Sequence, residues 1–190
     1  TDTLYLGSGN GFVLDKIEFS HIATPWLVLG SSLHQGAIQV LSDISFGGNL
    51  TLQNQGGSAG IHLAGALNVS GHTLGLLSGG DITQTSAGAI TAHSLLAMAG
   101  GDVSLTAAQN NLAATSLAGS AGGDFAYEDV DELAIGEVEA RGYSAPNPEV
   151  PGGLTALSAE GIAAEGHVLV ATASGNLILG ADVSGSSIDL

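Results

Sequence analysis

The chain contains no cysteine and only two basic residues, Lys16 and Arg141, among its 190 residues. The absence of cysteine excludes a disulfide framework, cysteine-liganded zinc and a cysteine nucleophile. Asp and Glu total 18, so the formal net charge is −16. Too few cations are present to neutralise nucleic-acid phosphates or to attract the chain to an anionic membrane surface. Nucleic-acid binding is therefore excluded, and the negative charge favours solubility.

Aromatic residues are also scarce, at 4%, whereas hydrophobic residues reach 44% and glycine occurs 30 times. This hydrophobicity excludes disorder, and each interior glycine costs about 1 kcal/mol in a helix. The longest apolar run, 25–29, is far shorter than the roughly 18 residues of a membrane helix. The chain starts without Met or a signal-peptide pattern, so we expect an internal or processed piece of a longer protein. The composition predicts a thin core of small residues with many tight turns.

One short pattern recurs along the chain: two small residues, then Asp or Asn, then alternating apolar residues. Its Asp or Asn stands at five positions: Asn49, Asp81, Asp102, Asp124 and Asn176. The two central spacings give a period of about 21 to 22 residues. Shorter alternating runs precede the pattern within each unit, for example 65–69 and 88–92. Each unit therefore holds about three short segments of period two, which is typical of β-strands.

Three strands in about 21 residues leave no room for helices, and no single unit can bury its own apolar face. If each unit makes one turn of a coil, equivalent strands stack in parallel about 4.8 Å apart and their inward residues merge into one core. The sequence therefore predicts an all-β fold, a right-handed parallel β-helix of three-strand coils. We expect residues 1–190 to form a single β-helix segment.

The wide spacing between Asp124 and Asn176 is interpreted as two coils plus about ten extra residues. The extra residues are assigned to a projecting loop at about 141–152, after a strand at 132–140. Proline has no N–H for the ladder, so this Pro-rich segment is expected to lie outside it. Because loops on rigid scaffolds often carry recognition, the loop is the candidate contact site. Its candidate contact residues are Arg141, Tyr143, Pro146, Pro148 and Pro151.

The runs 79–90 and 99–107 resemble the shaft repeats of filamentous haemagglutinin-type exoproteins, and the opening segments 4–7, 17–22 and 27–30 are similar to such proteins. The resemblance implies a large bacterial surface or secreted protein, exported by two-partner secretion or an autotransporter-like route. Such proteins act in adhesion, biofilm formation or contact-dependent competition. The Asn-Pro secretion signal of the family is not matched by 147–148, so the chain looks like a segment of the shaft.

The repeated Asp and Asn are expected to occupy one column of the coil. Their shared property is a short acceptor side chain that can bond the backbone two residues on, as in an Asx turn. The alternative is calcium, which could relieve repulsion between the stacked carboxylates of Asp81, Asp102 and Asp124.

Three histidines, His72, His93 and His167, lie at the same offset before an Asp or Asn of the repeat. Adjacent histidines could ligate a metal, but no third ligand is evident at a compatible place. We expect solvated turn positions.

An acidic run extends from Asp124 to Glu139. Paired carboxylates could serve a glycosidase or lyase. However, Arg141 is the only nearby cation, and aromatic residues that could bind a sugar are scarce. A solvated face is the simpler interpretation.

The resemblance implies a non-enzymatic shaft segment at the bacterial surface or in the secreted fraction, and the residue patterns predict no catalytic, cofactor-binding or metal-binding residues. Its expected partners are an outer-membrane secretion protein and a receptor or carbohydrate on a host or neighbouring cell. One alternative is a filament subunit that self-associates end to end. A second is a polysaccharide-binding or polysaccharide-degrading β-helix.

Overall fold

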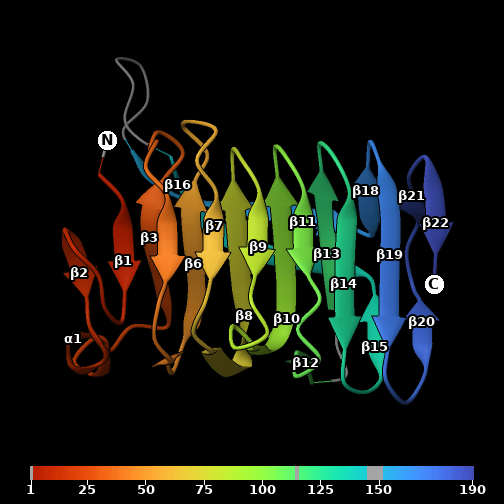
Figure 1. Ribbon diagram of the computed structural model, residues 1–190, viewed down its shortest axis with the longest axis horizontal. Helices are drawn as coiled ribbons and strands as arrows, with labels where there is room; N and C mark the ends of the chain where they lie inside the picture. Colours follow the sequence, from red (N-terminus) through yellow and green to blue (C-terminus); the bar gives the residue numbers. More distant parts are fainter. Residues whose placement is uncertain (1, 114–115, 145–151) are drawn as a thin grey trace.

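The computed structural model describes residues 2–113, 116–144 and 152–190. It is all-β, with 3% helix and 57% strand, and its parallel stacked coils make a solenoid of about 7 turns. Figure 1 shows the coils following one another along a single axis, with the two ends of the chain at opposite ends of the stack. The predicted parallel β-helix is confirmed.

The strands are short, and most of them contain three to six residues. They are β1 (Leu4–Leu6), β2 (Phe12–Leu14), β3 (Trp26–Ser31), β4 (Ile38–Val40), β5 (Ile44–Ser45), β6 (Asn49–Asn54), β7 (Ile61–Leu63), β8 (Leu67–Ser78), β9 (Ile82–Gln84), β10 (Ile90–Ala99), β11 (Val103–Leu105), β12 (Asn111–Leu112), β13 (Ser116–Ala121), β14 (Phe125–Asp129), β15 (Leu133–Ile135), β16 (Glu137–Ser144), β17 (Gly153–Glu160), β18 (Ile162–Ala164), β19 (His167–Thr172), β20 (Leu177–Leu179), β21 (Val183–Ser184) and β22 (Ser187–Asp189); the helix is α1 (Lys16–Ser20).

Two long sheets run along the stack. Sheet A has nine strands in the order β2-β1-β4-β7-β9-β11-β14-β19-β22. Sheet B has eleven, with the main path β20-β15-β13-β10-β8-β6-β3 and the short strands β5, β12, β18 and β21 attached to it. The pairs between successive coils are parallel, whereas β16 and β17 form a separate antiparallel pair.

One coil illustrates the predicted three-strand unit. It starts with β9 in sheet A and continues into the long strand β10 of sheet B. The register between β10 and β8 shifts between Ala92 and Ser94, which divides β10 into two straight segments. The coil then returns to sheet A as β11, where Val103 pairs with Ile82.

Apolar side chains at equivalent coil positions stack on one another inside the solenoid. In sheet B, Leu50 pairs with Leu74, Leu74 with Leu95, and Leu95 with Leu117. All four side chains are buried. Burying a leucine side chain contributes about 1.5–3 kcal/mol, so these columns supply much of the free energy that holds the coils together.

Polar side chains close some corners of the coil. Asn110 is buried, and its Nδ2 donates hydrogen bonds to Gln84 Oε1 at 3.1 Å and to the Leu105 carbonyl at 3.0 Å. Its Oδ1 accepts from the Ile90 N–H at 2.9 Å. The side chain thus satisfies backbone groups that the turn leaves without a ladder partner.

The insertion interrupts one strand of the coil, between β15 and β18, which both pair with β13. Ile135 pairs with Leu117, and Ile162 pairs with Gly119, so residues 136–161 occupy the place that Ala118 fills in the preceding coil. The interpretation of the wide spacing as two coils plus about ten residues is therefore wrong. His167, 43 residues after Asp124, already stands in the equivalent position of the next coil, because that coil carries the insertion. Residues 141–144, expected in a loop, belong instead to strand β16.

The two ends of the stack differ. Helix α1 and strand β2 occupy the N-terminal end (Figure 1). Asp15 caps α1, and Phe19 of α1 is buried with its ring 6.3 Å from that of Phe46 in an edge-to-face arrangement. At the other end, Ile188 is 42% exposed although Val168, with which it pairs, is buried.

The stacked leucine column predicts a large cost for a cavity in it. We expect Leu74→Ala to lower the free energy of unfolding by about 2–5 kcal/mol, because the neighbouring coils cannot close the gap. Thr83→Ala, on the outer side of sheet A, should cost less than about 1 kcal/mol. Urea unfolding followed by far-UV circular dichroism measures both, and equal effects would contradict the proposed core.

Candidate functional site

The insertion forms a two-stranded hairpin that lies against the outer face of sheet B. We call it the strap, and it comprises β16 and β17, with Glu137 paired to Glu160 at one end and Ser144 to Gly153 at the other. Strand β16 contacts β13, β10, β8, β6 and β3 in turn, so it runs along the solenoid axis across the coil strands. Figure 1 shows β16 behind the stack, near β3. Its 8 residues, at about 3.3 Å each, are long enough to cross five strands about 4.8 Å apart.

Apolar contacts attach the middle of the strap. Val138 and Ala140 of β16 are buried in a second hydrophobic cluster with Leu77, Leu96 and Ala118 of sheet B. This cluster is separate from the core inside the coils. The strap therefore covers apolar side chains that would otherwise face solvent.

The close approach of the strap requires a glycine beneath it. A Cβ added at Gly75 would lie 3.1 Å from the Ala140 Cβ and 2.9 Å from Thr51 Oγ1. Such contacts are tighter than van der Waals packing permits, so a larger residue at this position would push the strap away.

Polar contacts attach the end of the strap. The Tyr143 N–H donates to Gln53 Oε1 at 2.8 Å, across 90 residues of sequence. The Tyr143 carbonyl accepts from the Ser32 N–H at 3.0 Å. The Arg141 guanidinium lies 5.1 Å from the centre of the Trp26 ring, which is a cation–π contact. These contacts fix the strap to the coils nearest the N-terminus.

Of the five candidate contact residues, two lie in the described strap and three lie outside the described residues. Arg141 and Tyr143 lie in β16 and make contacts within the chain. Pro146, Pro148 and Pro151 lie outside the described residues. Among the described residues, the role that the structure gives to this segment is attachment of the strap to the solenoid.

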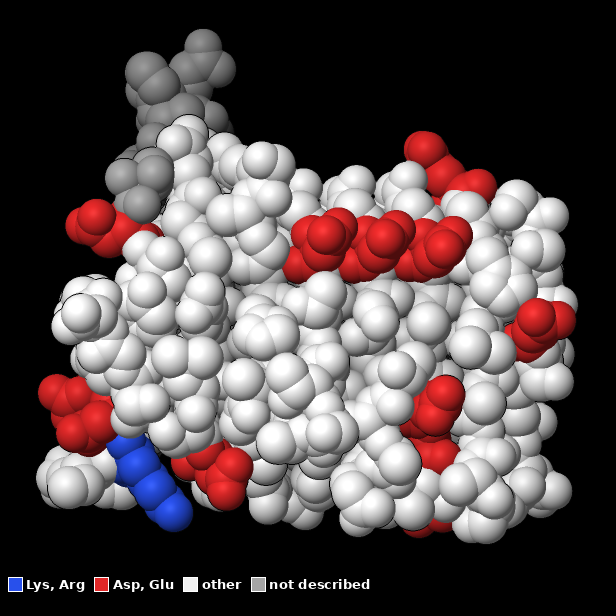
Figure 2. Space-filling view, in the orientation of Figure 1, with Lys and Arg blue, Asp and Glu red and all other residues white. Residues whose placement is uncertain are grey.

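Three aspartates form a ladder along the edge of sheet A. Asp81 Oδ1 accepts from the Asp102 N–H at 2.9 Å, and Asp102 Oδ1 accepts from the Asp124 N–H at 2.8 Å. Asp124 Oδ1 in turn accepts from the His167 N–H. Figure 2 shows the acidic row that these side chains make on the solvent-facing surface. These charge-assisted hydrogen bonds, together with solvent screening at this exposed edge, oppose the repulsion between neighbouring carboxylates.

This ladder corrects two expectations. Asn49 lies in β6 of sheet B, paired with Trp26, and Asn176 donates to Glu132 Oε2, so neither shares the column of the three aspartates. The aspartates also bond the next coil, 21 or 22 residues on for Asp81 and Asp102 and 43 residues on for Asp124, and not the backbone two residues on. The repeated pattern of two small residues followed by Asp or Asn therefore stands at or before strands of both sheets, which the sequence pattern alone could not distinguish.

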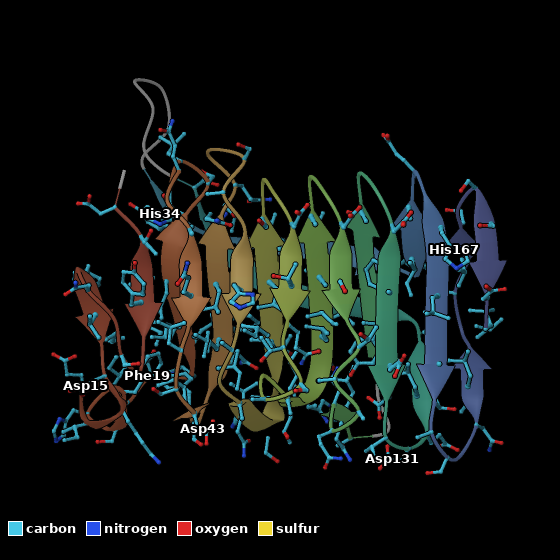
Figure 3. The ribbon with its side chains drawn as sticks, viewed as in Figure 1. Asp15, Phe19, His34, Asp43, Asp131 and His167 are labelled. Carbon is cyan, nitrogen blue, oxygen red and sulfur yellow. The ribbon has the colours of Figure 1, made fainter. Side chains whose placement is uncertain are left out.

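The histidines do not form one column either. His72 and His93 lie in β8 and β10 of sheet B, whereas His167 begins β19 in sheet A. His167 Nδ1 lies 2.6 Å from Ser187 Oγ, and its Nε2 lies 3.4 Å from Asp189 Oδ2. Figure 3 shows His167 near the C-terminal end of the stack. Among the described residues, no group of three or more side chains could hold a metal ion.

The acidic run is distributed over several elements. Asp124 belongs to the ladder, Asp129 ends β14, and Glu137 and Glu139 lie on the strap. The described carboxylates of the run are therefore not gathered around a common site.

Asp129 is the one acidic residue of this run that is buried, with 2% of its surface exposed. Its carboxylate accepts hydrogen bonds from the Tyr127 hydroxyl at 2.8 Å, the Leu112 N–H at 3.0 Å and the Asp131 N–H at 3.2 Å. Burial raises the pKa of the Asp129 carboxyl, and these hydrogen bonds oppose the shift. Burial, followed by the neighbouring Asp129 charge, raises the pKa of Tyr127. No signal in the sequence indicated that this aspartate turns inward, where it accepts hydrogen bonds from Tyr127 and from backbone N–H groups.

Comparisons with known proteins identify no relative. No protein family, curated protein or solved structure matches the chain. Within the described ranges, no helix has the length and apolar character needed to cross a membrane.

Detaching the strap should expose the single tryptophan. Val138 is 3% exposed, so Val138→Asp would bury a charge without a partner, and we expect the strap to leave sheet B. Emission from Trp26, the only tryptophan, should shift to longer wavelength, and the free energy of unfolding should fall by at least about 2 kcal/mol. Glu139→Gln, on the outer side of the same strand, is the control and should change neither. Unchanged emission in Val138→Asp would contradict the attachment.

The buried carboxylate predicts a pH dependence of stability. Because the pKa of Asp129 is raised on folding, its contribution to stability is fully present below the unfolded value of 3.8 and is lost as the pH rises through the folded pKa. Relative to Asp129→Asn, the wild-type protein should therefore lose stability over this interval. Urea unfolding at a series of pH values measures the difference. Glu139→Gln controls for charge removal, and a wild-type advantage that grows with pH would refute the prediction.

Proposed function

We propose that the chain is a non-enzymatic segment of the shaft of a large bacterial surface or secreted exoprotein. Its role is mechanical: a stack of coils makes a stiff rod that holds binding elements away from the cell in adhesion, biofilm formation or cell–cell contact. Export through an outer-membrane secretion partner and contact with a receptor on another cell belong to the same proposal.

The parallel stack of coils around one apolar core is the observation that carries the proposal, and its last coil presents an apolar face. Leu179, Ile188 and Leu190 are 55%, 42% and 55% exposed. With Val183 they line a cavity of about 430 Å³. Ile188 continues a column in which Phe125 and Val168 are buried, so this face has the side-chain pattern on which a further coil can stack.

The end-to-end filament requires that this open coil meet a matching face at the other end of a second copy. Helix α1 and strand β2 occupy that end, and β2 pairs only with β1 among the described strands. This asymmetry favours a continuous shaft over stacking of identical units.

The polysaccharide-degrading alternative requires carboxylates that converge on a substrate. Asp102 and Asp124 bond the backbone of the next coil, and Asp129 closes a corner. Structural roles therefore account for these carboxylates.

A register-matched extension tests whether the last coil accepts another coil. Ile188 corresponds to Ile82 through the paired positions of β19, β14 and β11, so Leu190 corresponds to Gln84. Residues 85–105, appended directly after Leu190, should therefore continue the solenoid by one coil. We expect a single unfolding transition at higher temperature and slow amide exchange in the new coil, because stability in such stacks grows with each interface.

The matched control carries Ile90→Asp and Leu95→Asp in the appended copy only, since both side chains are buried at the original positions. Its appended residues should exchange rapidly, and its unfolding temperature should equal that of the parent chain. If the unmodified extension exchanges as fast as this control, the last coil does not accept a further coil and the shaft proposal fails.

A further inference from the structure

A groove lies at the N-terminal end of the stack, formed by two adjoining cavities of about 420 Å³ and 540 Å³. Asp2, Thr3 and Phe12 line both cavities, His34 lines the first, and Tyr5 and Asn10 line the second. We call this the N-terminal groove. Figure 3 shows His34 at this end of the stack, remote from His167. The cavities fall within the range of about 300–1,000 Å³ that is usual for small-molecule sites.

Aromatic rings form part of the wall. Phe12 is 65% exposed, so a large apolar surface faces the groove without cover. Tyr5 is held from behind by the loop between β1 and β2. A Cβ at Gly9 would overlap the Tyr5 ring, and Gly9 and Gly11 have φ values of 151° and 137° that favour glycine. The glycines thus let the loop pack closely on one side of the Tyr5 ring.

Polar groups occupy the rest of the wall. Asp2, Thr3 and Asn10 supply carboxylate, hydroxyl and amide groups. The His34 Nε2 atom is buried and has no hydrogen-bond partner among the described residues. A buried polar atom without a partner costs about 1–3 kcal/mol, and such atoms are rare in folded proteins. A ligand hydroxyl reached by a small movement of the imidazole would supply the missing partner.

The charge of the groove limits the class of ligand. Among the residues that the structure describes, no Lys or Arg lines either cavity, and the carboxylate of Asp2 adds to the strongly negative charge of the chain. Phosphates and carboxylates are therefore disfavoured. A neutral sugar fits the remaining chemistry, because its C–H face can pack on an aromatic ring while its hydroxyls bond carboxylate, amide and imidazole groups.

We propose that the N-terminal groove binds a neutral carbohydrate, with Phe12 as the stacking ring and Asp2 and His34 as hydrogen-bonding groups. The site does not depend on the shaft proposal, since the groove is remote from the open C-terminal coil. A failure of either proposal would leave the other intact.

Titration of the ¹⁵N-labelled chain with neutral sugars tests the site. The probes are cellobiose, lactose, mannobiose and N,N′-diacetylchitobiose, with glucose 6-phosphate as the anionic comparison. We expect at least one neutral sugar to shift the amides of Gly11 and Gly30 and the imidazole of His34, and glucose 6-phosphate to bind more weakly. Phe12→Ala should weaken binding at least tenfold.

Ile17→Ala is the matched control, because Ile17 is 68% exposed on α1 and lines neither cavity. It should leave sugar binding unchanged. Asp2→Asn gives a second variant that keeps the shape of the groove, and it should also weaken binding. The proposal is overturned if no neutral sugar shifts these signals at tens of millimolar. It is also overturned if the anionic sugar binds best, or if Phe12→Ala and Asp2→Asn both bind as tightly as wild type.

Discussion

The parallel register between successive coils is the constraint on which the rest of the structure depends. Once each strand pairs in parallel with its counterpart in the next coil, every coil position becomes a column of side chains about 4.8 Å apart. An inward column must then be apolar and small enough to stack, as Leu50, Leu74, Leu95 and Leu117 do. An outward column brings like groups together, so the charges of the aspartate ladder need local partners. The next coil supplies them, since its N–H groups bond Asp81, Asp102 and Asp124.

The strap follows from the same geometry. Sheet B has two faces, and only the inner one lies against the core, so the outer side chains Leu77, Leu96 and Ala118 need cover of their own. A hairpin that runs along the axis covers several coils at once, whereas another coil would cover only its immediate neighbours. The same hairpin connects distant parts of the chain, through Gln53 and Tyr143 for example. It therefore couples coils that share no ladder hydrogen bonds.

The two ends of the stack carry different structural features. The N-terminal end carries the helix, the glycine loop around Tyr5 and the groove, whereas the C-terminal end exposes Leu179, Ile188 and Leu190. Between these ends, each column of buried side chains has a neighbouring coil on both sides.

The sequence by itself determined the coil, because a period of about 21 residues with three apolar alternations and little aromatic volume leaves few architectures that bury every unit. It also indicated that extra residues lie after Asp124. Only the tertiary structure decided where they enter, because Ile135 and Ile162 carry the same apolar signal as an uninterrupted strand. Likewise, the local pattern around Asn49 and Asn176 resembles that around Asp81. Only the strand pairing shows that the two Asn patterns lie at strands of sheet B, whereas Asp81 precedes a strand of sheet A. The N-terminal groove brings Tyr5 of β1 close to His34 in the turn after β3, and no spacing in the sequence predicts that these two residues lie near each other. Local alternation encodes which side of a strand faces inward, whereas contacts between coils depend on how the whole stack is wound.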